Sequence, residues 1–127
     1  FDREAASPAA ARGLMQLTLP TAGEAARELA EEPPAYLQLY EPARSLRLGA
    51  RTLQGLLSRF GGDAFRTISG YNAGAGQTAL WVGAAKKPDE ALLAAVTYAE
   101  TRTYLRRVLA HRTLYRLAEP DAPSSVR

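Results

Sequence analysis

Apolar residues recur at three- and four-residue steps along most of the chain, a spacing that is typical of helices. Thr21 followed by Glu24 matches a capping box, in which each side chain satisfies a free backbone amide. This box predicts a helix that begins there and continues to about Glu31, before Pro33 and Pro34 end it. No segment has a convincing strand pattern, so the sequence predicts an all-α protein.

A longer amphipathic helix is predicted after Glu41-Pro42, and the pair Gly61-Gly62 is expected to stop it. Apolar side chains three or four residues apart form a single stripe along this helix. The stripe is expected to face the core and consists of Leu46, Ala50, Leu53, Leu57 and Phe60.

Asp63 is a suitable cap for the next helix, because its carboxylate can accept from a free amide of the first turn. Phe65 and Ile68 are expected to face inward from this helix. The helix is predicted to break at a glycine-rich loop that contains Gly74 and Gly76.

The rest of the chain is also predicted to be helical. A short helical piece is expected around Leu80-Trp81-Val82, a helix start at Pro88-Asp89-Glu90, and a final helix from about Glu100. The stripe of that last helix is expected to be buried and consists of Tyr104, Leu105, Val108, Leu109 and Tyr115. The length favours one domain over 1–118, followed by a tail or linker over 119–127.

Composition excludes several kinds of site. The chain has 127 residues, of which 46% are hydrophobic and 23% charged, as in ordinary globular proteins. It has no cysteine and a single histidine, His111, so thiol chemistry and multi-histidine metal sites are excluded and no cofactor is expected. No apolar run is long enough to cross a bilayer, and the first residues lack a signal peptide's apolar stretch, so any export signal is expected outside this chain.

The net charge of +3 and the pI near 9.5 favour approach to an anionic polymer. The arginines are scattered along the sequence rather than massed, so nucleic acid is not indicated as a partner.

Three separated segments place glycines and polar residues in a specific order: Ser7-Pro8 with Gly13-Leu14-Met15-Gln16 and Thr21-Ala22, then Tyr71-Asn72-Ala73-Gly74-Ala75-Gly76, and finally Tyr98-Ala99-Glu100-Thr101-Arg102 with Tyr104. In this order they resemble the motifs of the lysozyme-like SLT domain of family 1 lytic transglycosylases. The resemblance extends over nearly the whole chain to about Tyr115. It implies an all-α, lysozyme-like fold, as in goose-type lysozyme, with a substrate cleft between an early Gly13–Gln16 helix and the Tyr71 loop.

The resemblance also implies an activity in the bacterial cell envelope, in the periplasm or outside the cytoplasm. Family members cleave the MurNAc–GlcNAc β-1,4 bond of peptidoglycan glycan strands and leave 1,6-anhydroMurNAc ends. Their general acid is a glutamate in a Glu-Ser-x-aromatic motif, and Phe1 resembles the aromatic position. The glutamate and the first helix are therefore expected upstream of Phe1, and the chain as given is expected to be inactive without them.

The matched motifs supply the candidate site residues. Tyr71 and Glu100 are expected to support the catalytic glutamate, although Tyr71 also suits packing and Glu100 also suits a helix start. Substrate contacts are expected from Ser7, Met15, Gln16, Asn72, Ala73 and Tyr98. Trp81 and Tyr104 have sugar-stacking faces too, but aromatic residues at helical spacing belong more often to a core.

Some positions depart from the family pattern. Ala10 stands where a glycine is usual, and Ala75 and Thr97 each replace a proline. These changes alter backbone freedom rather than chemistry. Two other functions stay open: a goose-type-lysozyme-like hydrolase in which water attacks, and a non-catalytic peptidoglycan-binding module.

Overall fold

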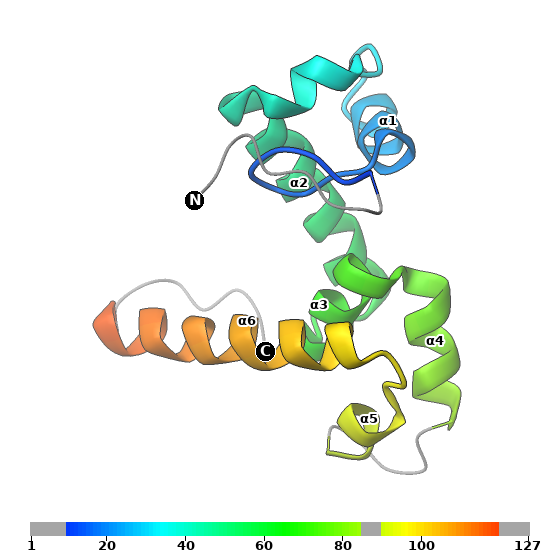
Figure 1. Ribbon diagram of the computed structural model, residues 1–127, viewed down its shortest axis with the longest axis vertical. Helices are drawn as coiled ribbons and strands as arrows, with labels where there is room; N and C mark the ends of the chain where they lie inside the picture. The colour runs from blue at the N-terminus through cyan, green and yellow to red at the C-terminus, as the bar shows by residue number, and fades with distance from the viewer. Residues whose placement is uncertain (1–9, 85–89, 120–127) are drawn as a thin grey trace. The chain divides into compact units, whose positions relative to one another are not determined.

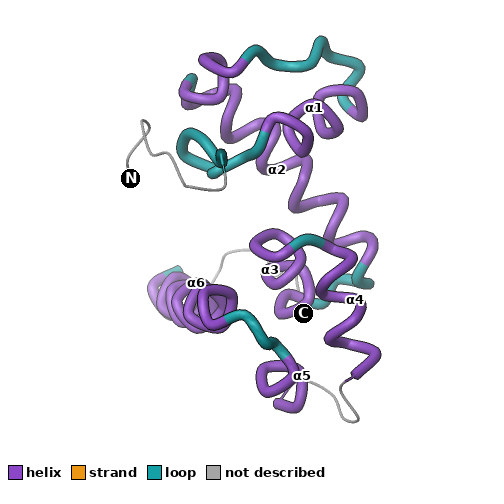
Figure 2. The backbone as a smooth tube through the Cα atoms, turned by 45° about the vertical axis from the view of Figure 1, so that its right-hand side comes forward, coloured by secondary structure: helices purple, strands orange, loops and turns teal. Residues whose placement is uncertain are grey.

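The computed structural model of the protein describes residues 10–84 and 90–119. All regular elements among these residues are helices, apart from an isolated antiparallel bridge between Arg12 and Leu17 (Figure 2). The predicted all-α architecture is therefore confirmed. None of the described helices is both long enough and apolar enough to cross a membrane.

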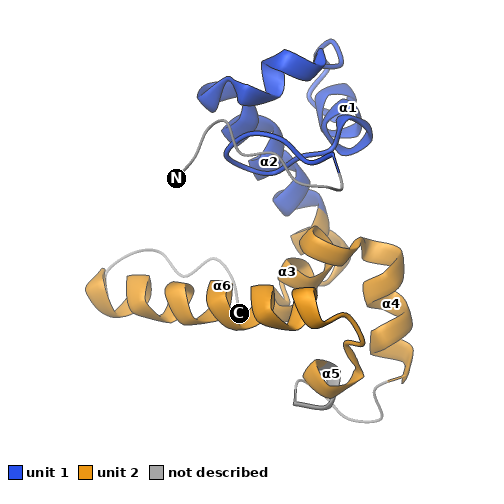
Figure 3. Ribbon diagram, in the orientation of Figure 1, with its two compact units in different colours: residues 1–55 blue, residues 56–127 orange. Residues whose placement is uncertain are grey.

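The chain divides into two compact units, Phe1–Gly55 and Leu56–Arg127 (Figure 3). The first unit contains α1 (Leu19–Glu28), the short 3-10 helix η1 (Tyr36–Tyr40) and most of α2 (Pro42–Arg59). The second contains the last turn of α2 and four further helices, α3 (Ala64–Ala73), α4 (Ala75–Ala84), α5 (Glu90–Ala95) and α6 (Ala99–Ala118) (Figure 1).

Helix α1 covers Leu19–Glu28 and begins earlier than the capping box at Thr21 predicted. The cap is Thr18, whose side chain accepts from the Thr21 backbone N–H at 3.4 Å, and Pro20 fits the first turn. The predicted start was wrong because a second threonine three residues upstream takes the cap position. The helix also ends at Glu28, before the predicted Glu31, because Ala30 has φ 56°, a left-handed backbone that cannot continue a right-handed helix.

Helix η1 covers Tyr36–Tyr40, and α2 covers Pro42–Arg59. The predicted end of α2 is confirmed, because Gly61 and Gly62 both have positive φ, at 61° and 81°, which only glycine adopts easily.

The predicted core stripe of α2 was wrong at its first two positions. Leu46 is 51% exposed and Ala50 is also exposed, whereas Leu53, Leu57 and Phe60 are half-buried. The buried face of the helix is instead formed by Ser45, Leu48 and Gly49. Hydrophobicity misidentified the face because two of the three buried residues are small, which lets another segment approach closely.

Three arginines on α2 bind the end of α1 and the residues that follow it. Their partners are the Glu32 carbonyl for Arg44 at 2.8 Å, the Glu31 carboxylate for Arg47 at 2.6 Å, and the Glu28 carboxylate for Arg51 at 2.9 Å. These pairs are partly exposed, so each contributes at most about 1 kcal/mol, but together they orient α1 on α2.

In the second unit, α3 covers Ala64–Ala73, α4 Ala75–Ala84, α5 Glu90–Ala95 and α6 Ala99–Ala118. Helix α3 packs on α4 and α6, and α4 packs on α5. The buried members of their shared core are Ile68, Trp81, Val96 and Leu105, with Phe65 and others packed around them. The predicted Asp63 cap of α3 is confirmed, since its carboxylate accepts from the Arg66 N–H at 2.8 Å.

The glycine-rich loop predicted after α3 was wrong. Tyr71, Asn72 and Ala73 form the last turn of α3, and Gly76 already belongs to α4. Only Gly74, with φ 89°, separates the two helices. The glycine suits this junction because its backbone reaches a left-handed φ at no steric cost. A loop of several residues is therefore not needed between the two helices.

The final helix α6 begins one residue before the predicted Glu100. Leu105 is fully buried and Tyr104, Val108 and Leu109 pack around the core, as predicted, but Tyr115 is 66% exposed. Figure 1 shows the reason, because the last turns of α6 extend beyond α3. The predicted helix start at Pro88-Asp89 and the residues from Pro120 of the predicted tail lie outside the described residues.

Candidate functional site

The Gly13–Gln16 segment is a tight loop, so the helix predicted there was wrong. Its ends are joined by two backbone hydrogen bonds between Arg12 and Leu17, at 2.9 and 3.1 Å. Gly13 has φ 72° and Gln16 has φ 48°, and this left-handed backbone cannot continue a right-handed helix.

Gly13 allows this loop to dock on the neighbouring elements of the first unit. A β-carbon on Gly13 would lie 1.9 Å from the Leu39 carbonyl oxygen of η1. The next contact is to α2, where the Ser45 hydroxyl accepts from the Met15 N–H at 3.1 Å. Leu39 and Ser45 are both fully buried. Two features therefore hold the early loop in place. The lack of a side chain at Gly13 allows close approach to Leu39, and the buried hydroxyl of Ser45 accepts a hydrogen bond from the loop.

Two predicted substrate-binding residues belong to this loop. Met15 is half-buried, with its side chain against Gly49 of α2, where an added β-carbon would lie 2.6 Å from the Met15 Cγ. Gln16 is exposed, and its Nε2 donates to the Gly13 carbonyl at 2.9 Å. The loop thus presents one apolar and one polar side chain. Ser7, the third candidate of this motif, lies outside the described residues.

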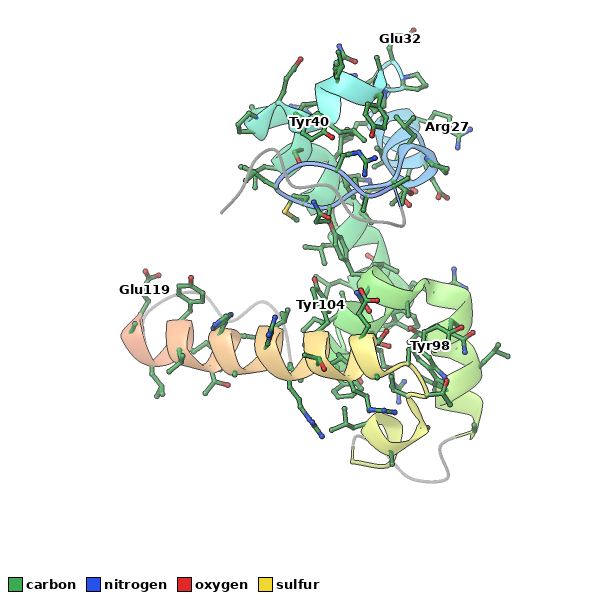
Figure 4. The ribbon with its side chains drawn as sticks, in the orientation of Figure 1. Arg27, Glu32, Tyr40, Tyr98, Tyr104 and Glu119 are labelled. Carbon is green, nitrogen blue, oxygen red and sulfur yellow. The ribbon has the colours of Figure 1, made fainter. Side chains whose placement is uncertain are left out.

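The second group of candidates lies where the end of α3 meets the start of α6. Tyr71 is half-buried in the last turn of α3, and burial together with the neighbouring Tyr104 raises the pKa of its phenol. Burial also raises the pKa of Tyr104 on α6 (Figure 4). A tyrosine phenol is already neutral at physiological pH, and the raised pKa keeps both side chains neutral at higher pH as well. A neutral phenol can donate a hydrogen bond and is a weak nucleophile.

Asn72, the next residue, connects two of the sequence motifs directly. Its Oδ1 accepts from the hydroxyl of Thr101 at 2.7 Å, and Thr101 is only 2% exposed. Sequence reasoning assigned no role to Thr101. The available signal was its place inside the Glu100-Thr101-Arg102 segment, but nothing in the sequence indicates that its side chain turns toward α3.

Glu100 lies in the first turn of α6 and is exposed. A carboxylate at this position interacts favourably with the helix dipole, so the structure accommodates the helix-start interpretation as well as a role in the site. Ala73, predicted to contact substrate, is partly buried, and its side chain packs against the core of the second unit.

Tyr98 lies just before α6, next to α4 (Figure 4), and is 50% exposed. Its hydroxyl donates to the Gln77 Oε1 at 3.4 Å. Its ring packs edge-to-face with Trp81, with the two ring centroids 5.1 Å apart. Trp81 is a core residue, 4% exposed, whose indole N–H donates to the Thr97 hydroxyl at 3.3 Å. The ring of Tyr98 is thus held from one side while the rest remains accessible to a ligand.

Among the described residues no three or more His, Asp or Glu side chains are grouped so that they could hold a metal ion.

The model of the transglycosylase SLT domain family matches residues 1–98. The chain belongs to this family. The chain is 32% identical over 123 residues to the soluble lytic murein transglycosylase of Escherichia coli K12, and this match covers 93% of the chain and 19% of that protein. The protein of the same name from Salmonella typhimurium is 33% identical over 115 residues, covering 87% of this chain and 18% of its own length.

Solved structures agree with this assignment. An inactive mutant of the lytic transglycosylase Slt from Pseudomonas aeruginosa, with a glutamate replaced by glutamine, matches with a TM-score of 0.84 and 30% identity. The complex of a 70-kDa soluble lytic transglycosylase with bulgecin A matches with a TM-score of 0.88 and 28% identity. Both matches cover the whole of this chain and 21% of the solved chain. The predicted lysozyme-like helical fold is therefore confirmed, and the chain spans about a fifth of the length of the relatives it matches.

Proposed function

We propose that the polypeptide containing this SLT domain is a peptidoglycan lytic transglycosylase that cleaves the MurNAc–GlcNAc β-1,4 bond. The observation that carries the proposal is the match of the SLT family model to residues 1–98, in a chain whose relatives are named murein transglycosylases. The hydrogen bond between Asn72 and Thr101 supports it, because it brings two of the matched motifs together in one unit.

In the proposed reaction, one protonated carboxyl group donates its proton to the glycosidic oxygen as the bond to the anomeric carbon breaks. The resulting carboxylate then removes the proton of the C6 hydroxyl of the same muramic ring. The C6 oxygen attacks the anomeric carbon and closes the 1,6-anhydro ring, so neither water nor an enzyme nucleophile is consumed. The inactive glutamate-to-glutamine mutant of the Pseudomonas relative supports a glutamate in this role.

The described residues would assist this reaction in different ways. Tyr71 would donate a hydrogen bond to the carboxylate or to the sugar, since its phenol stays neutral. Glu100, one helical turn from Tyr104 on α6, would provide a second carboxylate that orients groups around the reaction. Substrate contacts would come from Ser7, Met15, Gln16, Asn72, Ala73 and Tyr98.

The proposed substrate implies a location in the cell envelope, in the periplasm or otherwise outside the cytoplasm. Since the named relatives are about five times as long as this chain, we also propose that other domains accompany the SLT domain.

The direct test is mass spectrometry of muropeptides released from peptidoglycan by the native polypeptide that contains this chain, including any residues that precede Phe1. Anhydro-muropeptides are the expected product. Reducing ends would instead identify a goose-type-lysozyme-like hydrolase, and binding without release would identify a non-catalytic module.

A further inference from the structure

We propose that Thr101 is a positioning residue, which holds the Asn72 amide so that its NH2 group faces an acceptor oxygen of the bound glycan. This inference rests on the proposed function, because it assigns an orientation to a residue of the proposed site. It concerns a residue for which the sequence motifs alone indicate no role.

The hydroxyl of Thr101 has an unusual partner for a helical threonine. Threonine hydroxyls inside helices commonly donate to the backbone carbonyl one turn earlier. Two other threonines of α6 follow this rule, since Thr103 donates to the Ala99 carbonyl at 3.1 Å and Thr113 to the Leu109 carbonyl at 3.0 Å. Thr101 instead donates to the Asn72 side chain of α3 at 2.7 Å.

Burial makes this contact a strong constraint on Asn72. Thr101 is 2% exposed, so water has little access to its hydroxyl, and breaking the bond would leave a buried donor unsatisfied. Asn72 is only half-buried and forms part of the last turn of α3. The oxygen of the amide is therefore hydrogen-bonded to a buried group, while part of the side chain remains accessible to a ligand.

The direction of the hydrogen bond decides which branch of the amide is available to a ligand. An asparagine amide has an acceptor oxygen on one branch and a two-hydrogen donor on the other. Because the oxygen accepts from Thr101, the NH2 branch points away from that hydroxyl. Asn72 would therefore recognise acceptors of the glycan, such as an N-acetyl carbonyl, a ring hydroxyl oxygen or the lactyl carboxylate.

The second unit also contains a matched control. Thr78 of α4 is fully buried, and its hydroxyl shares a hydrogen bond with that of Ser69 on α3 at 3.0 Å. Like Thr101, it joins a neighbouring helix to α3 through a buried hydroxyl, but its partner is not a proposed site residue. Thr78→Val therefore removes an equivalent structural contact without releasing Asn72.

The test compares Thr101→Val, Thr101→Ser and Thr78→Val in the native polypeptide, by turnover kinetics and by calorimetric binding of a purified muropeptide. We expect Thr101→Val to raise KM and the muropeptide Kd about threefold to tenfold with little change in kcat. Thr101→Ser keeps the hydroxyl and should restore both values. Thr78→Val should lower stability to a similar degree and leave KM and Kd unchanged.

Asn72→Asp tests the orientation itself. The aspartate still accepts from Thr101 but lacks the NH2 donor, so the muropeptide Kd should rise at least as much as in Thr101→Val. Three outcomes would each overturn the inference. These are wild-type affinity in Asn72→Asp, equal effects of Thr101→Val and Thr78→Val on the muropeptide Kd, and failure of Thr101→Ser to restore binding. A wild-type protein that binds muropeptide without cleaving it would refute only the proposed function, since the Kd comparison still decides the role of Thr101.

Discussion

Met15 of the early loop lies directly against Gly49 of α2. A β-carbon on Gly49 would lie within 2.7 Å of the Cβ, Cγ and Cε of Met15, closer than real side chains approach one another. The contact therefore requires glycine on the helix. Because Gly49 has no side chain, Met15, a proposed substrate-binding residue, can pack directly against the backbone of α2.

Gly49→Ala should consequently destabilise the protein by about 1–3 kcal/mol, because Met15 and its loop must shift to make room. The same change should weaken muropeptide binding, since Met15 is displaced. Gly55→Ala is the matched control on the same helix, where nothing lies within 4 Å of an added β-carbon. This control should stabilise the protein by about 0.5–1 kcal/mol through helix propensity. Urea unfolding of both variants measures the difference, and equal effects would contradict the packing argument.

Ala10→Gly should stabilise the protein. Ala10 has φ 61°, a left-handed backbone that costs an L-residue roughly 1–2 kcal/mol, part of which is offset by the greater freedom of glycine in the unfolded chain. A net gain of about 0.5–1 kcal/mol is expected in chemical denaturation. Ala50→Gly, at an exposed position inside α2, should have the opposite sign, with a loss of about 1 kcal/mol. A loss of stability in both variants would argue against strain at Ala10.

Stability should fall at alkaline pH because of Tyr71. An unfolded tyrosine loses its proton near pH 10, whereas burial keeps the pKa of Tyr71 higher in the folded state. Above about pH 10 the unfolded chain therefore binds fewer protons than the folded protein. The contribution of Tyr71 to the free energy of unfolding is fully present below that pH and declines above it, by at most about 1.4 kcal/mol per pH unit. Urea unfolding between about pH 8 and about pH 11 should show that the free energy of unfolding declines less steeply in Tyr71→Phe than in the wild type. Tyr115→Phe removes a phenol at an exposed position and serves as the control variant.

Tyr71→Phe should also lower the turnover of the native polypeptide, by about tenfold or more, because the phenolic donor is lost while the buried ring remains. Muropeptide release measures this loss, and circular dichroism should show an unaltered fold. Unchanged turnover would reduce Tyr71 to a packing residue.

Glu100→Gln distinguishes the two interpretations of that carboxylate. If Glu100 supports the reaction, as proposed, turnover should fall about tenfold. The helix-dipole contribution is only about 0.3–1 kcal/mol, so the unfolding free energy should change little. A small loss of stability with normal turnover would leave Glu100 as a helix-start charge alone.

The features that could be predicted from the amino-acid sequence alone are those that depend on local backbone chemistry. The Asp63 cap, the stop of α2 at Gly61 and Gly62, and the break at Gly74 were predicted correctly, because caps and left-handed glycines act over a few residues. The order of the three motifs was also sufficient to indicate the family that the comparisons confirm.

The buried helix faces and the contacts between distant residues could not be predicted in this way, because they depend on how the helices pack. Burial depends on the element that lies opposite, so Leu46 is exposed while Ser45 and Gly49 face the early loop, and Tyr115 is exposed because α6 extends beyond α3. The hydrogen bond between Asn72 and Thr101 joins two helices, and no local pattern in either helix specifies it. These contacts depend on packing between elements, for which hydrophobic periodicity supplies a face but not a partner.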